Sequence, residues 1–335
     1  MKIRFVLATG AVAATVLSLP TQAAELRMTA CFHKNHDYVV ALQKAFLEPI
    51  NSRKGPVTVK YLGGPEVTPW QKQAQSLKRG NVDLIFCPAA YYSGDLAAAR
   101  IPGAQNRSLE EIRANGGWDL MQKAWGKGMN ARILSWNFFQ GQKFYLYTIF
   151  EPKLSKETGV DLSGVKMRAT PLYRAFLTAM GATPVVIKPG EVYTSLERGL
   201  VQGLAWPWGS VGTYGWERFL KYRIEPDFFG ASMLMIANLD KYKSLSKAER
   251  DALEAQARTL EKAGDEVMVA QGHKDDAKLK KAGVKSFKLE GEYAKAYLRT
   301  IYGAKWAEND THKGKYAAVG VDYEELKSKV FEPVK

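Results

Sequence analysis

Arg168 is the residue of this chain best placed to hold an anion. It lies near the end of a predicted strand, residues 165–169, and just before Thr170 and Pro171, which predict the start of a helix. Threonine is a good N-cap, and proline fits the first helical position, where its missing N–H costs nothing. A guanidinium donates two parallel hydrogen bonds to a carboxylate, and free N–H groups at a helix start favour anions. The junction therefore predicts a carboxylate site; the alternative is a surface arginine paired with an acidic side chain.

The elements around Arg168 alternate between strand and helix. Apolar residues of the helix after Arg168 recur at a spacing of four, and Gly181 suits the left-handed position that ends a helix. Three more elements follow: a strand at 184–187, a helix at 191–198 and a strand at 201–206. Such alternation predicts a parallel sheet with its ligand at the carboxyl ends of the strands.

A long series of motifs in this region resembles a known family. The motifs are Asp161, Lys166-Met167-Arg168, Gly181-Ala182-Thr183-Pro184-Val185, Glu191-Val192-Tyr193 and Leu196-Glu197-Arg198-Gly199-Leu200-Val201-Gln202-Gly203. Together they closely resemble the solute receptors of tripartite ATP-independent periplasmic (TRAP) transporters, and a weaker resemblance extends from about Glu25 to about Glu290. In that family the arginine at the matching strand end clamps the substrate carboxylate, which implies this role for Arg168.

The rest of the chain predicts two α/β lobes. The N-terminal part reads as five alternating elements: strand 26–32, helix 37–50, strand 57–61, helix 69–78 and strand 82–87. Later, Ser246 and Glu249 form a capping box that opens a helical run to about Ala282, on the order of 50 Å long. A second capping box starts at Ser108. The predicted fold is therefore an α/β two-lobe periplasmic binding protein with a ligand cleft between the lobes and a long helix crossing both.

The predicted organisation has four parts. Residues 1–23 form a signal peptide, 24–145 the first lobe, 146–240 the second lobe with crossing segments, and 241–335 the long helix and a helical C-terminal region packed across the lobes. The leader has a positive start, an apolar run and a small-residue cleavage site, which favours cleavage after Ala23 or Ala24. The alternative, a transmembrane anchor, needs a longer and more apolar run. Export to the periplasm is expected.

Several aromatic and basic residues are further ligand candidates. Relatives often carry Gly-Phe-Arg in the segment of Phe138 and Lys143, so a point charge replaces a bidentate arginine here. Many relatives have Glu-Asn-Pro where this chain has Ala205-Trp206-Pro207, followed by Trp208. An indole face in place of a polar amide argues against a small dicarboxylate. Tyr91 lies in a loop that the family places against the ligand. For each aromatic residue, an ordinary core position is the alternative.

The segment from Cys31 to His36 has residue types that bind metals, but it has no evident fourth ligand or oriented partners. We therefore expect His33 to donate to an anionic ligand; an exposed loop histidine is the alternative. In the fold that the resemblance implies, the strands ending near Cys31 and Cys87 are parallel neighbours. A disulfide between them suits an oxidising compartment; two separate buried thiols are the alternative.

The net charge of +14 becomes +12 (14 − 2) without Lys2 and Arg4, yet the basic residues are scattered. The chain has no nucleic-acid motif, nucleophile elbow, zinc motif or phosphate loop. No nucleic-acid partner, metal or cofactor is therefore expected. A lysine-rich solvated surface explains the charge better than a docking patch does.

The pattern and the resemblance predict a receptor, not an enzyme. It would capture an organic acid, with an aromatic or 2-oxo monocarboxylate favoured over a C4-dicarboxylate, and deliver it to the membrane permease subunits of a TRAP-type transporter. A receptor for an ABC-type anion importer and an exported enzyme acting on small organic acids are the alternatives. The sequence is compatible with a monomer or a homodimer.

Overall fold

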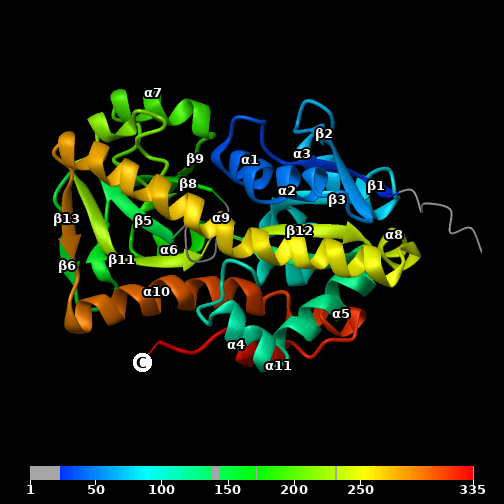
Figure 1. Cartoon of the computed structure of the whole chain (residues 1–335). Coiled ribbons are helices and arrows are strands. Elements are labelled where there is room, and N and C mark those ends of the chain that lie inside the picture. Colours follow the sequence, from blue (N-terminus) through cyan, green and yellow to red (C-terminus); the bar gives the residue numbers. More distant parts are fainter. Residues whose placement is uncertain (1–22, 138–142, 171, 231, 335) are drawn as a thin grey trace, which may run out of the picture.

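The chain folds around two main sheets, one in each lobe (Figure 1). The structure is a computed structural model that describes residues 23–137, 143–170, 172–230 and 232–334. The first sheet has the strand order β2-β1-β3-β12-β4 and the second has the order β13-β11-β5-β10-β8-β9. The predicted two-lobe α/β fold is confirmed. The predicted signal peptide, residues 1–23, lies almost wholly outside the described residues.

The first sheet contains both parallel and antiparallel strands. Its strands are β1 (Ala24–Ala30), β2 (Val57–Gly63), β3 (Leu84–Pro88), β4 (Ala131–Asn137) and β12 (Met233–Asn238). Strand β1 pairs in parallel with β2 and β3, whereas β12 runs antiparallel to β3 and β4. The helices that pack around this sheet include α1 (Asp37–Leu42), α2 (Glu48–Ser52), α3 (Trp70–Lys78), α4 (Leu109–Ala114), α5 (Gly117–Met129), α8 (Leu239–Ser244) and α11 (Tyr323–Val330).

The second sheet carries the motif around Arg168. Its strands are β5 (Lys143–Thr148), β8 (Lys166–Ala169), β9 (Thr183–Val186), β10 (Gly203–Pro207), β11 (Tyr222–Gly230) and β13 (Lys285–Lys288). Strand β8 lies between β9 and β10 and is parallel to both. The short helices α6 (Arg174–Ala179) and α7 (Val192–Glu197) connect these strands. A small hairpin, β6 (Lys153–Ser155) and β7 (Gly159–Asp161), precedes β8.

The helix after Arg168 starts later than the sequence predicts. Helix α6 begins at Arg174, not at Thr170 or Pro171. The reason is a local turn, because the N–H of Leu172 bonds to the Thr170 hydroxyl at 3.3 Å and the N–H of Tyr173 bonds to the Thr170 carbonyl at 3.1 Å. These bonds use Thr170 before the helix starts. The predicted helix start directly after Arg168 is therefore wrong, whereas the predicted stop at Gly181, with φ +85°, is confirmed.

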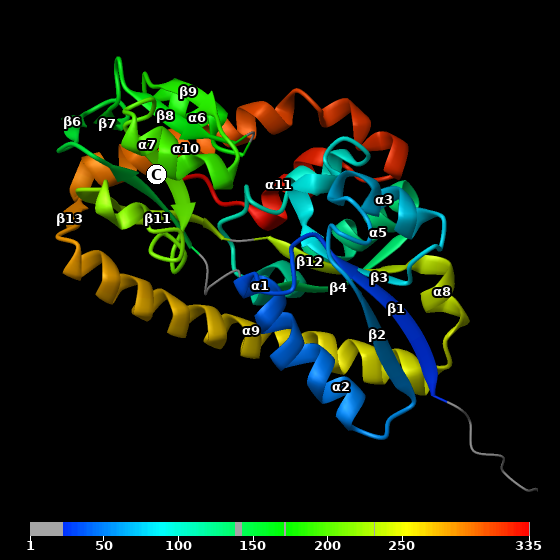
Figure 2. The ribbon, with the colours of Figure 1, turned by 90° about the horizontal axis from the view of Figure 1, so that it is seen from above.

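The long helix α9 (Lys247–Lys281) runs along both lobes, as Figures 1 and 2 show from two directions. Its 35 residues correspond to about 52 Å. The predicted capping box is present, since the Ser246 side chain accepts from the N–H of Glu249 and the Glu249 side chain bonds back to the N–H of Ser246. Helix α10 (Gly291–Asp310) then leads the chain back towards the first lobe. Among the described residues, no helix has the length and apolar character needed to cross a bilayer.

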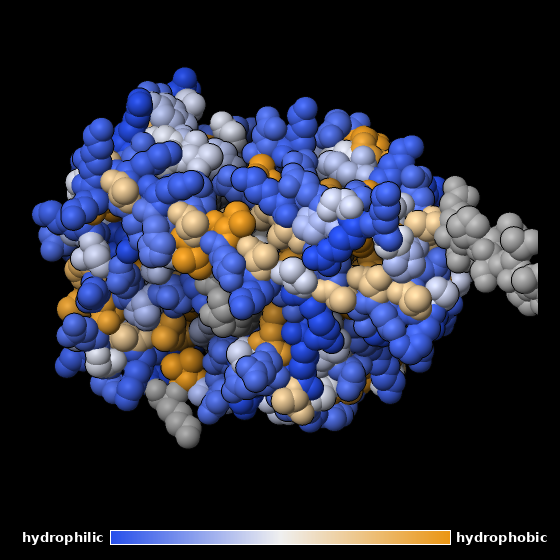
Figure 3. All heavy atoms as spheres, in the orientation of Figure 1, coloured by the Kyte–Doolittle hydropathy of each residue, from blue (hydrophilic) through white to orange (hydrophobic). Residues whose placement is uncertain are grey.

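The disulfide between Cys31 and Cys87 is confirmed. Strands β1 and β3 pair in parallel with Ala30 opposite Phe86, so the next residue of each strand lies beside its counterpart. The two cysteine Cα atoms are 5.1 Å apart, a normal separation for a disulfide. On the face shown in Figure 3, hydrophilic residues cover most of the surface and apolar areas are smaller.

Candidate ligand-binding site

Arg168 lies at the carboxyl end of β8 and is buried, with 1% of its surface exposed. Its Nε donates to the carbonyl of Ile187, just beyond β9, at 2.9 Å. Its Nη1 is also buried but has no hydrogen-bond partner among the described residues. A buried donor without a partner costs free energy, more so when the group is charged. The hydrogen bond from Nε therefore holds the Arg168 guanidinium in place, while Nη1 remains available to donate to an anion.

Trp206 covers one side of this guanidinium. Strand β10 pairs Leu204 with Arg168, so Trp206 lies two residues farther along on the same face of the sheet. The Arg168 Cζ lies 5.0 Å from the centre of the indole ring, which is the arrangement of a cation–π contact. The indole N–H donates to the Ser210 hydroxyl at 2.8 Å. One face of the ring is thus used by Arg168 and its only donor by Ser210.

Two more aromatic rings support Trp206. The Tyr214 and Trp216 rings stack on each other at 4.6 Å, and both meet Trp206 edge-on, at 5.6 Å and 4.8 Å between ring centres. We call these three residues the lobe-2 aromatic cluster. Trp216 is buried, whereas Trp206 and Tyr214 are partly exposed. The cluster therefore presents apolar ring surface beside a positive charge.

Tyr173 lies on another side of Arg168. Burial raises the pKa of the Tyr173 hydroxyl, and the positive charge of Arg168, together with hydrogen bonds to Thr170 and Arg168, partly offsets the rise. The hydroxyl therefore remains neutral at physiological pH. It adds a neutral polar group next to the charged one.

The first lobe brings a second set of rings to the same region. We call Phe32, His36, Tyr38, Trp70 and Tyr91 the lobe-1 aromatic cluster. The Phe32 and His36 rings stack at 4.2 Å, and the Trp70 and Tyr91 rings lie 4.4 Å apart. Burial lowers the pKa of His36 to about 4, with His33 adding to the effect, so the His36 ring is neutral near pH 7.

The pKa shifts of two tyrosines of the lobe-1 cluster include contributions from groups of the second lobe. Partial burial raises the pKa of Tyr91 to about 12, the Tyr173 hydroxyl adds to the rise, and the positive charge of Arg168 opposes it. Burial also raises the pKa of Tyr38, and Tyr173 and Tyr214 contribute to that rise. Charges interact over such distances only when the groups are close. Tyr91 and Tyr38 are therefore close enough to the groups around Arg168 for these groups to influence their pKa values.

Three other predicted ligand residues have partners of their own. His33 is exposed and its Nδ1 pairs with Glu66 at 3.2 Å. The Trp208 indole N–H donates to Asp276 of α9 at 3.0 Å. Lys143 faces carboxylates: burial lowers the pKa of its ammonium group, and Asp227 and Asp265 oppose that shift. Phe138 lies outside the described residues. That these residues contact the ligand remains a prediction.

Sequence reasoning missed Tyr173, Tyr214 and Trp216. Their positions depend on a loop whose course no local pattern predicts. The density of tyrosine and tryptophan between residues 206 and 219 was the available signal. In the first lobe, His36 and not His33 belongs to the ring cluster, because His36 is the N-cap of α1 and its ring turns towards Phe32.

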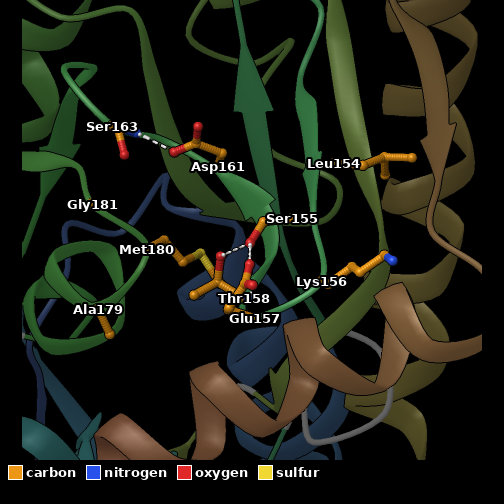
Figure 4. Close-up of a pocket in the computed structure, with 10 residues that line it drawn as sticks. All are labelled: Leu154, Ser155, Lys156, Glu157, Thr158, Asp161, Ser163, Ala179, Met180 and Gly181. Atoms are coloured by element: carbon orange, nitrogen blue, oxygen red, sulfur yellow. Dashed lines mark hydrogen bonds between the residues drawn. The ribbon is translucent and has the colours of Figure 1, made fainter.

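A separate hollow of about 470 Å³ lies at the opposite end of β8, between the β6–β7 hairpin and the end of α6 (Figure 4). Its polar groups bond to one another: Ser155 with Glu157 at 3.0 Å, and the Ser163 N–H with Asp161 at 2.9 Å. Among the described residues that line this hollow, none has a buried side-chain donor or acceptor without a partner, unlike Nη1 of Arg168. In the described part of the chain, no group of three or more His, Cys, Asp or Glu could hold a metal ion.

Comparison with known families gives one match. Residues 157–308 match the family described as bacterial extracellular solute-binding protein, family 7. This segment includes Arg168, Trp206 and all of α9.

Comparison with solved structures gives whole-chain similarity. A TRAP periplasmic solute-binding protein from Ochrobactrum anthropi, with its C-terminus in the ligand-binding pocket, has 20% identity and a TM-score of 0.74, covering 92% of this chain and 95% of its own. One from Roseobacter denitrificans, with bound 3-deoxy-D-manno-oct-2-ulosonic acid, has 17% identity and a TM-score of 0.71, covering 92% and 99%. One from Bordetella bronchiseptica, with copurified calcium and picolinate, has 19% identity and a TM-score of 0.72, covering 92% of each chain. At these identities the similarity shows the fold.

Proposed function

We propose that this protein is a periplasmic receptor for an organic acid, because residues 157–308 match family 7 of the bacterial extracellular solute-binding proteins and the chain has the fold of TRAP solute receptors. It binds the acid and delivers it to the membrane permease subunits of a TRAP-type transporter. The prediction of a binding protein rather than an enzyme agrees with this family and with the relatives named above, which are all solute-binding proteins.

One observation carries the proposal: the buried Arg168 has an unpartnered Nη1 beside the face of Trp206. A carboxylate placed there receives a charge-assisted hydrogen bond from Nη1. It also removes the free-energy cost of the unpartnered donor. In support, the ligand in the Roseobacter relative is a carboxylic acid by name, and picolinate is a carboxylate.

The rings around Arg168 favour an acid with an aromatic or 2-oxo body. The lobe-2 cluster offers ring faces for apolar or π-bonded atoms, whereas Tyr173 offers a hydroxyl for a keto or hydroxyl oxygen near the carboxylate. A second carboxylate, as in succinate, would lie among rings that carry no positive charge. An aromatic or 2-oxo monocarboxylate is therefore the ligand class that fits best.

Binding and closure are coupled in this proposal. Contacts from a ligand to both aromatic clusters favour the state in which the lobes are close together, and the membrane partner then recognises that state. The lobe-1 cluster supplies ring surface and the second lobe supplies the charge.

A thermal-shift screen tests the proposal. Each acid is paired with its neutral amide, for example benzoate with benzamide, because a ligand that binds only the folded protein raises the melting temperature by mass action. A free ligand concentration of one hundred times the Kd stabilises the folded protein by about 2.7 kcal/mol. The proposal expects shifts for acids and none for the matching amides. Shifts for amides alone, or turnover of a bound acid, would instead favour another receptor class or an enzyme.

Trp206→Asn tests the ligand class. If the indole packs on the ligand, the variant loses about 1–3 kcal/mol of affinity for phenylpyruvate, the scale of exposing a buried apolar side chain. The affinity for succinate stays the same or improves, because an amide both donates and accepts hydrogen bonds. Calorimetry with both acids gives the ratio of the phenylpyruvate affinity to the succinate affinity for each protein. An unchanged ratio with a lower melting temperature would mean that Trp206 is a core residue only.

A further inference from the structure

The loop that follows Trp206 is seated on helix α9. This loop, residues 208–215, contains Ser210, which accepts the indole N–H of Trp206, and Tyr214, whose ring meets Trp206 edge-on. At its start, the Trp208 ring lies directly on Gly272 of α9: a Cβ added at Gly272 would be 2.5 Å from a ring atom. The Trp208 indole N–H also donates to Asp276, one turn farther along.

Asp275 of α9 holds the middle of loop 208–215. Its side chain is fully buried, and its Oδ1 accepts the N–H of Gly212 at 2.7 Å. The backbone N–H of Val211 also lies near enough to this carboxyl group to lower its pKa, whereas the buried Oδ2 has no hydrogen-bond partner among the described residues. The approach is so close that a Cβ at Gly212 would lie 2.7 Å from Asp275 Oδ1 and 2.8 Å from Cδ of Lys278. A buried carboxylate receiving backbone N–H groups makes a strong and directional anchor.

Helix α9 is itself fixed to the first lobe. Arg132 of β4 donates to Glu254 at 2.7 Å. Glu261 accepts from Arg113 at 2.6 Å and from the backbone N–H of Trp136 at 2.9 Å. These contacts lie in the first half of the helix, whereas Asp275 lies near its end. Through α9, the position of loop 208–215 therefore depends on contacts with the first lobe.

We propose that Asp275 is a positioning residue for acid binding: by holding the backbone of the loop at Gly212, it keeps Ser210 and Tyr214 against Trp206 and so orients the ring beside Arg168. This inference rests on the proposed function for its ligand and on the contacts of α9 for its geometry. Asp275 itself does not touch the acid. Its effect passes through loop 208–215 to the indole, so it determines selectivity between aromatic and small acids.

The charged groups around Asp275 are compatible with this role. Lys278 and Asp276 lie on the same helix, Tyr147 of β5 interacts electrostatically with Asp275, and Arg223 of β11 pairs with the neighbouring Asp276. Lys278 also interacts with Asp37 of the first lobe. Burial raises the pKa of Asp275 to about 6, while the N–H groups of Gly212 and Val211 oppose the rise. The carboxylate is therefore charged at neutral pH, when its hydrogen bonds to the loop are strongest.

The test compares Asp275→Ala with Asp275→Asn, because the amide oxygen of asparagine can still accept from Gly212. Amide hydrogen exchange in the ligand-free protein measures how firmly residues 208–215 are held, and calorimetry with phenylpyruvate and succinate measures selectivity. For Asp275→Ala we expect exchange of this segment to rise at least about tenfold and the phenylpyruvate Kd to rise about tenfold more than the succinate Kd. Asp275→Asn should stay within about threefold of the wild type in both.

Two further variants separate positioning from general destabilisation. Gly212→Ala disturbs the same contact from the loop side and should act like Asp275→Ala. Leu326→Ala leaves a cavity in the buried core of the first lobe, and should lower the melting temperature without changing exchange of 208–215 or selectivity. Unchanged exchange, or an unchanged affinity ratio, in Asp275→Ala and Gly212→Ala overturns the inference. If the wild type binds no phenylpyruvate, the proposed ligand class fails, and the exchange measurement still decides whether Asp275 holds the loop.

Discussion

At the scale of single residues, Arg168 and Trp206 illustrate what sequence alone can and cannot predict. Arg168 was identifiable because a strand end in a strand–helix alternation limits where its side chain can lie. Trp206 was identifiable because it replaces a polar residue of the family motif. Tyr173 and Tyr214 were not, since neither a turn at Thr170 nor a loop anchored on α9 leaves a periodic pattern. The cation–π contact between Arg168 and Trp206 also needed coordinates.

Arg168→Gln should weaken binding of the best acid from the screen by about 2–5 kcal/mol, because a buried charge-assisted contact is lost. Arg174→Gln is the matched control: Arg174 is exposed at the start of α6, only six residues away. Calorimetry on both variants checks this. Near wild-type affinity in Arg168→Gln would remove Arg168 from the site.

Asp275→Asn should change how stability depends on pH. The native pKa of Asp275 is about 6, above the ordinary value of 3.8, so the folded protein binds this proton more tightly than the unfolded chain does. The contribution of Asp275 therefore lowers the free energy of unfolding as the pH rises from about 4 to about 6, by up to about 3 kcal/mol, and changes little above that. Urea unfolding at several pH values should show Asp275→Asn gaining stability relative to the wild type as the pH rises. Parallel curves for the two proteins would contradict the raised pKa.

At the scale of elements, the capping boxes and the strand–helix order were predictable, because they depend on near neighbours in the sequence. The Ser108 and Ser246 boxes both form. The start of α6 was predicted too early, because a side-chain turn at Thr170 competes with the helix. The antiparallel β12 was not predicted, because it returns to the first sheet from a distant part of the chain. Long-range pairing of this kind has no local signature.

Gly272→Ala should destabilise the protein although alanine favours helices. The added methyl group would meet the Trp208 ring, and overpacking of this kind costs about 1–3 kcal/mol. Gly303→Ala in α10 is the matched control, because a Cβ there meets nothing within 4 Å and should stabilise the helix by about 0.5–1 kcal/mol. Thermal unfolding of the two variants should therefore shift in opposite directions. Equal shifts would mean that Trp208 does not pack on Gly272.

At the scale of the whole molecule, the first lobe is joined internally by the Cys31–Cys87 disulfide beneath the lobe-1 aromatic cluster. The bond links the carboxyl ends of β1 and β3, from which Phe32 and Tyr91 extend. The second lobe has no cysteine among its residues. A covalent bond therefore stabilises the part of the site in the first lobe. The part in the second lobe is stabilised by packing and by contacts with α9.

Replacing Cys31 and Cys87 together by alanine should lower stability by up to about 4 kcal/mol, the chain-entropy estimate for a loop closed over 56 residues. Urea unfolding of this double variant beside the oxidised wild type measures the difference. Mass measurement with and without reduction confirms that the wild-type sample is bridged. A wild type that carries the bridge yet unfolds at the same urea concentration as the variant would argue against this contribution.

The anchoring of loop 208–215 on α9 has a consequence for how such receptors can be recombined. A chimera that takes one lobe from this protein and the other from a relative would keep each sheet intact. It would nevertheless separate Trp206 from the helix that sets its angle, since α9 follows β12 of the first sheet in the sequence and its first half is matched to the first lobe. Ligand choice would therefore not be inherited with the lobe that carries Arg168. It belongs to the second lobe and α9 jointly, and a transplant must move the two together.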